Sequence, residues 1–181
     1  YGGNFDNRTI FGVEIAKRIR KEIGEDIPLI ARISVTEYHD DGWDVNSSIE
    51  FSKKLKNSGI DMIDCSSGGN YSDQNIELKP GYQVPLSKSI KENVDILTGA
   101  VGLITAKNQA EEILNNHECY FHTDAAQSFG KDLDTLKNKR IDLISVSGHK
   151  IFGPKGIGAL ITRLRDFNKP PLNPLFFIHC Q

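Results

Sequence analysis

Two residues that can do cofactor chemistry, Asp124 and Lys150, each follow a short apolar run typical of a buried parallel strand. A lysine amine forms a Schiff base with a carbonyl when its neighbours lower its pKa. A carboxylate held against a pyridine nitrogen is the partner that a pyridoxal-phosphate lysine requires. Parallel sheets bind ligands beyond the carboxyl ends of their strands, so we expect both residues at one such edge. A surface lysine and a capping aspartate would explain the isolated pair equally well.

A second set of residues lies earlier in the chain. Arg32 is the one charge in the apolar run of residues 28–35, and a cation on a predicted buried strand needs a partner. Gly99 and Gly102 follow another apolar run, where a glycine turn lets backbone amides approach a phosphate. The alternative is that the arginine pairs with a structural acid and that the glycines are only turns.

The elements that must position these residues alternate between strand and helix, which predicts a parallel α/β fold. Asn7 or Thr9 is expected to cap the first helix, and Gly24 to end it. Residues Asp44 to Ser48 offer caps for the second. We expect helices over residues 11–23, 49–55, 86–91 and 108–114, and a short connection or helix over 129–136. The expected strands cover residues 28–35, 60–65, 96–102, 119–124, 141–146 and 157–162. The last of these strands is expected to pair antiparallel with its neighbour.

The composition is that of a globular chain. The 181 residues include 38% hydrophobic and 25% charged residues, and the net charge of -2 gives no argument for a nucleic-acid or acidic-lipid partner. No apolar run approaches the roughly 20 residues that span a bilayer, and no secretory signal is recognised. The three cysteines show no CxxC spacing, so we expect no metal site and a reducing, cytoplasmic setting. Both ends read as interior sequence of longer proteins.

An ordered series of motifs carries a family resemblance over residues 1 to about 116. It comprises Tyr1-Gly2-Gly3-Asn4, Asn7-Arg8, Ala31-Arg32-Ile33-Ser34, Asp41-Gly42-Trp43, Asp64-Cys65-Ser66-Ser67-Gly68-Gly69, Pro80-Gly81-Tyr82-Gln83-Val84 and Thr98-Gly99-Ala100-Val101-Gly102-Leu103-Ile104-Thr105. This part resembles the bacterial NADPH-dehydrogenase branch of the old yellow enzymes, which are FMN-dependent ene reductases on a TIM barrel. The resemblance implies that Arg32 lies against the flavin ring, stabilising the negative charge of the reduced flavin. It also implies that the Gly99–Gly102 turn approaches the FMN phosphate.

The resemblance covers only part of the second half of that barrel. The family's histidine pair, catalytic tyrosine and early flavin-binding strands are expected before Tyr1. The final Gly-Arg phosphate strand is replaced by residues 118–127. An unclosed barrel leaves its edge strands exposed.

A second series of motifs lies between about residue 112 and residue 176. It comprises Tyr120-Phe121-His122-Thr123-Asp124-Ala125-Ala126-Gln127, Ile141-Asp142-Leu143-Ile144-Ser145-Val146-Ser147-Gly148-His149-Lys150, Gly153-Pro154-Lys155-Gly156-Ile157-Gly158-Ala159-Leu160 and Pro170-Pro171-Leu172-Asn173-Pro174-Leu175. This part resembles the cysteine desulfurases of the class V aminotransferase group, in particular the branch that serves DNA sulfur modification. The resemblance implies a pyridoxal-phosphate Schiff base at Lys150, with Asp124 on the pyridine nitrogen. It places Gln127 on the phenolic oxygen, and Ser147 and His149 on the phosphate.

The nucleophilic cysteine of that family would lie beyond the end of this chain. Cys180 is outside its motif, and Cys119 is expected to be a buried small hydrophobe. The two resemblances meet near residues 111–114, where either family can supply the end of a helix before a strand.

We therefore expect an α/β chain with two segments: partial TIM-barrel βα units over residues 1–116, and part of the fold type I pyridoxal-phosphate transferase large domain over 117–181. Its family-level function combines FMN-dependent NAD(P)H oxidation with sulfur transfer from cysteine, and little or no turnover is expected from this chain alone. The alternatives are an FMN-binding remnant and a non-catalytic α/β scaffold. The expected partner is a small-molecule cofactor, and both families are often homo-oligomers.

Overall fold

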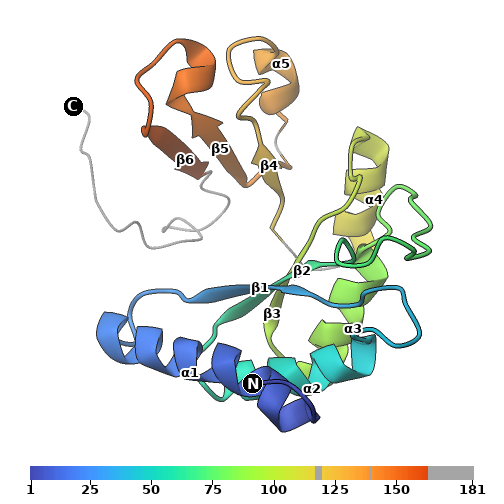
Figure 1. Cartoon of the computed structure of the whole chain (residues 1–181). Helices are drawn as coiled ribbons and strands as arrows, with labels where there is room; N and C mark the ends of the chain where they lie inside the picture. The colour runs from blue at the N-terminus through green and yellow to red at the C-terminus, as the bar shows by residue number, and fades with distance from the viewer. Residues whose placement is uncertain (117–119, 139, 163–181) are drawn as a thin grey trace. The chain divides into compact units, whose positions relative to one another are not determined.

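The computed structural model describes residues 1–116, 120–138 and 140–162 (Figure 1). The chain divides into two compact units, Tyr1–Gln109 and Ala110–Gln181, and each is described by itself. The junction inferred between residues 116 and 117 stays a prediction, since the division into units does not test where two families join. Cys119, Cys180 and the proline-rich stretch 170–177 lie outside the described residues.

The first unit alternates helix and strand, as the sequence predicts. Its elements are α1 (Phe5–Ile23), β1 (Ile30–Ser34), α2 (Val45–Lys56), β2 (Met62–Ser66), α3 (Val84–Val94) and β3 (Leu97–Ala100), and α4 (Lys107–Asn116) begins at its end. The three strands form one parallel sheet in the order β1-β2-β3. Helix α3 is longer than predicted at both ends. It starts earlier because Pro85 belongs to its first turn, where the missing N–H of proline costs no hydrogen bond.

The caps of α1 differ in part from the prediction. The side chain of Asn4 caps the helix by accepting a 2.9 Å hydrogen bond from the Asn7 N–H. The prediction of Asn7 or Thr9 as the cap is wrong, since both lie within the helix. Thr9 is buried there, and its hydroxyl donates to the Phe5 carbonyl at 3.0 Å. Gly24 ends the helix at φ 74°, as predicted.

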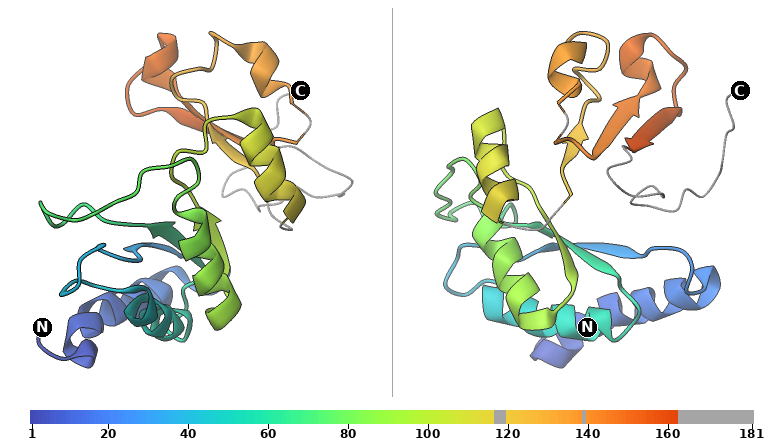
Figure 2. Two further views of the ribbon diagram at one scale, coloured as in Figure 1. Left: turned by 90° about the vertical axis from the view of Figure 1, so that its right-hand side faces the viewer. Right: turned by 180° about the vertical axis from the view of Figure 1, so that it is seen from behind.

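The helices of this unit cover one face of the sheet (Figures 1 and 2). Side chains alternate between the two faces of a strand, so only every second residue of β1 and β2 meets the helices. Those residues form the core with Ile90 of α3, Leu55 of α2 and Ala16 of α1; they are Ala31, Ile33, Ile63 and Cys65. The opposite face carries the other residues of the strands, including Arg32, Asp64 and Gly99.

Strand β1 is present where it was predicted, but it is not a buried strand. Within the described residues it pairs with β2 alone, so it is an edge of the sheet. Ile30 is 55% exposed, and the side chain of Arg32 is 60% exposed. An apolar run cannot by itself distinguish a strand covered on both faces from an edge strand covered on one.

A buried arginine joins three turns of the first unit. Arg20, near the end of α1, donates to the carbonyl oxygens of Gly59 (2.9 Å from Nε), Gly24 (2.6 Å) and Ile27 (2.8 Å). Its Nη2 also pairs with the Asp61 carboxylate, which accepts the Leu29 N–H at 2.7 Å. The end of α1, the entry to β1 and the turn before β2 are therefore held by one guanidinium group.

The second unit contains a separate three-stranded sheet. Its described elements after α4 are β4 (His122–Asp124), α5 (Leu133–Leu136), β5 (Leu143–Ser147), the 3-10 helix η1 (Gly148–Ile151) and β6 (Gly158–Thr162). Strands β4 and β5 are parallel, and β6 is antiparallel to β5, as predicted. The buried apolar side chains here include Ala125, Leu136, Ile141 and Val146.

Candidate functional site

The candidate residues of the first unit lie side by side on the uncovered face of its sheet. Arg32 of β1 is in register with Asp64 of β2, and Asp64 is in register with Gly99 of β3. Residues in register across parallel strands point to the same face, so the structure brings Arg32 and Gly99 next to the same carboxylate. Gly102 lies in the turn that follows β3.

Arg32 is engaged by an acid of its own sheet. Its Nη1 donates a 2.8 Å hydrogen bond to Asp64 Oδ2, and its Nη2 lies 3.5 Å from Ser66 Oγ. The pairing with a structural acid, left open by the sequence, is therefore present. The ion pair does not bury the guanidinium, since the Arg32 side chain remains 60% exposed to solvent.

The two glycines occupy places where a side chain would not fit. A Cβ on Gly99 would lie 2.9 Å from Met62 Cε and 3.2 Å from Asp64 Oδ1. Gly102 has φ +96°, and a Cβ there would lie 2.9 Å from Gln83 Oε1. Its carbonyl accepts the Gly81 N–H at 2.9 Å, which fixes the turn.

The first site fits the polar edge of a flavin ring. Ser34 lies two residues after Arg32 on the same strand, and its hydroxyl is buried without a hydrogen-bond partner among the described residues. A side chain at position 99 would collide with Met62 and Asp64, so the glycine lets these two side chains lie against β3. A planar ligand with hydrogen-bonding groups at its edge would meet Arg32 and Ser34 together. Sequence reasoning did not single out Ser34, because only burial shows that its hydroxyl lacks a partner.

In the second unit the predicted residues gather at the carboxyl ends of β4 and β5. Asp124 is the last residue of β4 and Ser147 the last of β5, while Lys150 lies in η1 directly after β5. The two strands are parallel, so these ends meet at one edge of the sheet. Asp124 and Lys150 are both exposed. Asp124 Oδ1 accepts the Ala126 N–H at 3.0 Å, so the aspartate also caps the turn that carries Gln127.

The same sheet presents a polar face that the sequence only partly indicated. His122 Nε2 and Ser145 Oγ lie 3.0 Å apart, and Ser145 is in register with Asp124. His122, Asp124, Ser145 and Ser147 alternate with the buried side, where Ala125 and Val146 lie. His122 and Ser145 were not predicted as site residues, although their alternation with apolar neighbours was a signal for this face.

In the loop after β5, the backbone at Gly148 packs closely against the backbone at Ile157. Ser147 Oγ and His149 Nδ1 lie 3.0 Å apart, so the two residues predicted to bind a phosphate are brought together. A Cβ on Gly148 would lie 2.8 Å from the Ile157 carbonyl oxygen, to which the Gly148 N–H donates. The hydroxyl, imidazole, carboxylate and amine at one sheet edge fit the groups of pyridoxal phosphate.

The one described cysteine is not suited to nucleophilic chemistry. Cys65 is fully buried on β2, and burial raises the pKa of its thiol to about 11. A thiol with a pKa this high stays protonated near neutral pH and is a weak nucleophile.

No helix within the described ranges has the length and apolar character that a membrane span requires.

Two family models match the chain. The model of the NADH:flavin oxidoreductase / NADH oxidase family matches residues 1–121, and that of the class-V aminotransferases matches residues 86–175. The prediction of segments from two families is thereby confirmed. Both models match residues 86–121, a stretch that includes β3, α4 and the predicted meeting point at residues 111–114.

Two individual relatives match the chain over part of its length. An NADPH dehydrogenase of Bacillus cytotoxicus is 43% identical over 146 residues, which cover 74% of this chain and 41% of that protein. Among solved structures, a 2-naphthoyl-CoA reductase in complex with 2-naphthoyl-CoA matches with a TM-score of 0.57 and 25% identity, over 64% of this chain and 18% of the reductase. The chain thus spans less than half the length of either relative.

Proposed function

The chain belongs to the NADH:flavin oxidoreductase / NADH oxidase family, and from this premise we propose that its first unit is the flavin-binding segment of an NADPH-dependent ene reductase. The observation that carries the proposal is the uncovered face of the β1-β2-β3 sheet. Arg32 and Ser34 lie on this face, two residues apart on β1. Sequence similarity to an NADPH dehydrogenase supports the same function.

Each residue has a definite task in this proposal. FMN, when bound, supplies hydride transfer. The guanidinium of Arg32 holds a fixed positive charge toward the edge of the ring, where a reduced flavin is negative. Asp64 orients that guanidinium through the 2.8 Å hydrogen bond, and the turn at Gly102 brings backbone amides toward the phosphate. With only part of the barrel in this chain, we expect binding with little or no turnover.

The test is a titration of the full chain with FMN, following the fluorescence and visible spectrum of the flavin. We expect saturable binding that weakens at least about tenfold in Arg32→Ala, the equivalent of about 1.4 kcal/mol. Arg18→Ala, which removes an exposed arginine from α1, is the matched control and should bind like the unaltered chain. Absence of flavin binding, or equal binding by Arg32→Ala, would refute the proposal.

A second candidate function rests on the second unit. We propose that Lys150 forms a Schiff base with pyridoxal phosphate, in a segment derived from a cysteine desulfurase. The polar face with His122, Asp124 and Ser147 at the ends of β4 and β5 favours it. Asp124 would hold the proton on the pyridine nitrogen, and Gln127 would bond the phenolic oxygen. Cys65 does not supply the thiol for sulfur transfer from cysteine, because it is buried and its pKa is raised to about 11.

Borohydride reduction after addition of pyridoxal phosphate tests this candidate. A phosphopyridoxyl adduct should appear at Lys150 by peptide mass analysis, and it should be lost in Lys150→Ala. Lys155→Ala, at an exposed lysine in the loop after η1, is the control and should retain the adduct. Modification spread evenly over surface lysines would contradict a specific site.

If neither cofactor binds, the remaining alternative is a non-catalytic α/β scaffold. For the chain in either case, we propose a reducing, cytoplasmic setting from the cysteine usage.

A further inference from the structure

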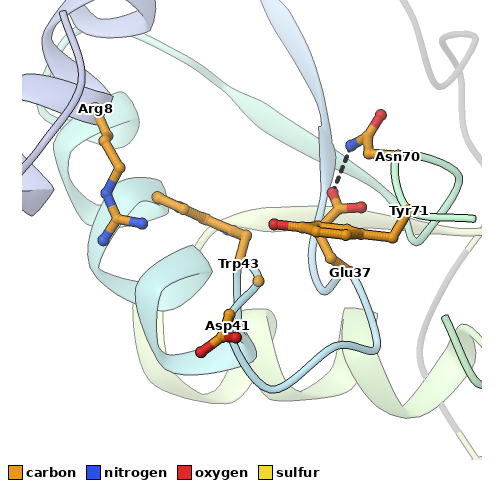
Figure 3. A pocket seen from close by; sticks show the side chains of 7 residues that line it. Arg8, Glu37, Asp41, Trp43, Asn70 and Tyr71 are labelled. Carbon is orange, nitrogen blue, oxygen red and sulfur yellow. Dashed lines mark hydrogen bonds between the residues drawn. The ribbon is translucent and has the colours of Figure 1, made fainter. Parts of the chain in front are cut away.

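An open pocket of about 410 Å³ lies beside the carboxyl end of β1, and neither cofactor prediction uses it (Figure 3). Its walls come from α1, the β1–α2 loop and the β2–α3 loop, all within the first unit. The lining residues are Arg8, Glu37, Asp41, Gly42, Trp43, Asn70 and Tyr71. The pocket combines two aromatic rings with two carboxylates and one guanidinium.

A buried carboxylate with one oxygen unpaired lines this pocket. Glu37 is only 5% exposed, and its Oε1 accepts a 2.7 Å hydrogen bond from Asn70 Nδ2. Its Oε2 is buried and has no hydrogen-bond partner among the described residues. A buried charged oxygen without a partner costs more than about 1–3 kcal/mol, so a donor is needed at this position.

The backbone around Glu37 fixes the carboxylate in place. The Glu37 N–H donates to the Trp43 carbonyl at 2.9 Å, which closes the loop between them. A Cβ on Gly42 would lie 2.9 Å from Glu37 Cβ, so the loop can pack this tightly only around a glycine. The unpaired oxygen therefore belongs to a held side chain rather than to a freely rotating one.

The aromatic walls are also held. Tyr71 stacks on His39 with ring centroids 4.5 Å apart and an interplanar angle of 6°. Trp43 packs edge-on against Phe51 at 6.0 Å, and its Nε1 donates to Ser48 Oγ. Rings fixed in this way can receive a flat or apolar group at little entropic cost.

The positive charge in the pocket already has partners. The guanidinium of Arg8 lies 5.4 Å from the centroid of the Trp43 ring, a cation–π contact. Arg8 also interacts with Asp44, whose carboxyl has a pKa below its usual value, first because it accepts the Ser47 N–H and to a smaller extent because Arg8 is near. The formal charge left facing the pocket is then that of Glu37 and Asp41, which is negative.

We propose that this pocket binds a small organic ammonium ion that carries an apolar or aromatic body. The ammonium N–H donates to Glu37 Oε2, and the body lies against Trp43 and Tyr71. A cationic donor satisfies the buried oxygen and its charge together, which a neutral hydroxyl does only in part. An anion would meet two carboxylates. The binding site goes beyond the proposed function, because Glu37 has no role in holding either cofactor.

Benzylammonium is the probe, and the fluorescence of Trp43 is the signal, because this is the one tryptophan of the chain. Titration of the full chain at neutral pH should give a saturable change in emission. Benzyl alcohol and benzoate have the same ring with a neutral and an anionic group, and each should bind at least about tenfold more weakly. This comparison needs no substitution, so it does not depend on the folding of a variant.

Glu37→Gln keeps the shape of the side chain and removes its charge, and it should weaken benzylammonium binding at least about tenfold. Asp40→Asn removes a charge from an exposed residue that does not line the pocket, and its affinity for benzylammonium should stay within about twofold of the unaltered chain. Circular dichroism confirms the fold of each variant. The proposal is overturned if no probe gives a saturable signal. That result would mean that water alone donates to Glu37 Oε2. The proposal is equally overturned if benzyl alcohol binds as tightly as benzylammonium, or if folded Glu37→Gln binds unchanged.

Discussion

Arg32 and Asp64 face each other across the β1–β2 pair, with Nη1 of the arginine 2.8 Å from Oδ2 of the aspartate. The aspartate is in register with Gly99 on its other side, where a Cβ would lie 3.2 Å from Asp64 Oδ1. Such an arrangement orients a guanidinium without covering it. The pair is therefore compatible with both a structural role and the flavin-binding role proposed for Arg32.

Stability measurements separate these two roles. Arg32→Ala should change the free energy of unfolding by less than about 1 kcal/mol, because an exposed ion pair is screened by water and its side chains lose entropy when ordered. The same should hold for Asp64→Asn. Urea unfolding followed by circular dichroism measures both. A loss well above 1 kcal/mol would mean that the pair chiefly holds the sheet together, and lost flavin binding in Arg32→Ala would then need a structural explanation.

Arg20→Ala should have a much larger effect on stability than Arg32→Ala. Arg20 is buried, and its removal leaves the Gly24, Ile27 and Gly59 carbonyls without a donor. We expect the free energy of unfolding to fall by about 3 kcal/mol, the usual cost of breaking a buried charged network. Arg18→Ala lies two residues earlier on the exposed side of α1, and it should stay within about 0.5 kcal/mol of the unaltered chain. Equal unfolding midpoints for the two variants would contradict the assigned network.

A pair of glycine substitutions separates backbone strain from lack of space. Gly102 (φ +96°) and Gly69 (φ +99°) have nearly the same left-handed backbone, but only at Gly102 would a Cβ meet other atoms, at 2.9 Å. Both alanine variants should lose about 1 kcal/mol from the backbone conformation. Gly102→Ala should lose more, since Gln83 and Tyr82 must move. Thermal or urea unfolding of the two variants measures the difference in their free energies of unfolding. Equal losses of stability would show that Gln83 and Tyr82 move aside at little cost.

The buried thiol of Cys65 predicts a loss of stability in alkali. Burial raises its pKa from 9.0 to about 11, so the folded chain holds the proton more tightly than the unfolded chain does. The resulting stability is present in full below pH 9 and is lost as pH rises through about 11. The free energy of unfolding should therefore fall more steeply between these pH values than in Cys65→Ala, which keeps every other titrating group. Parallel slopes for the two proteins would show that the thiol is not buried in solution.

The order of the elements followed from local sequence, although many of their bounds differ from the prediction by a few residues. Gly24 was correctly predicted as the end of α1, and residues Asp44 to Ser48 as the start of α2, because caps and left-handed turns depend on a few adjacent residues. The antiparallel strand β6 was predicted from its apolar pattern beside a turn. The sequence also indicated both families, since their motifs are contiguous stretches that need no tertiary information.

The partners of the site residues were decided by tertiary structure. Arg32 was expected on a buried strand, yet it lies at an open edge with Asp64, 32 residues away in the chain. Glu37 was not singled out from the sequence, and only its burial shows an oxygen that lacks a donor. Periodicity and capping are local, and sequence alone therefore determined which elements form and their order along the chain. Burial and pairing depend on which distant segments pack together, and for that physical reason only the fold decided which polar groups are left to bind a ligand.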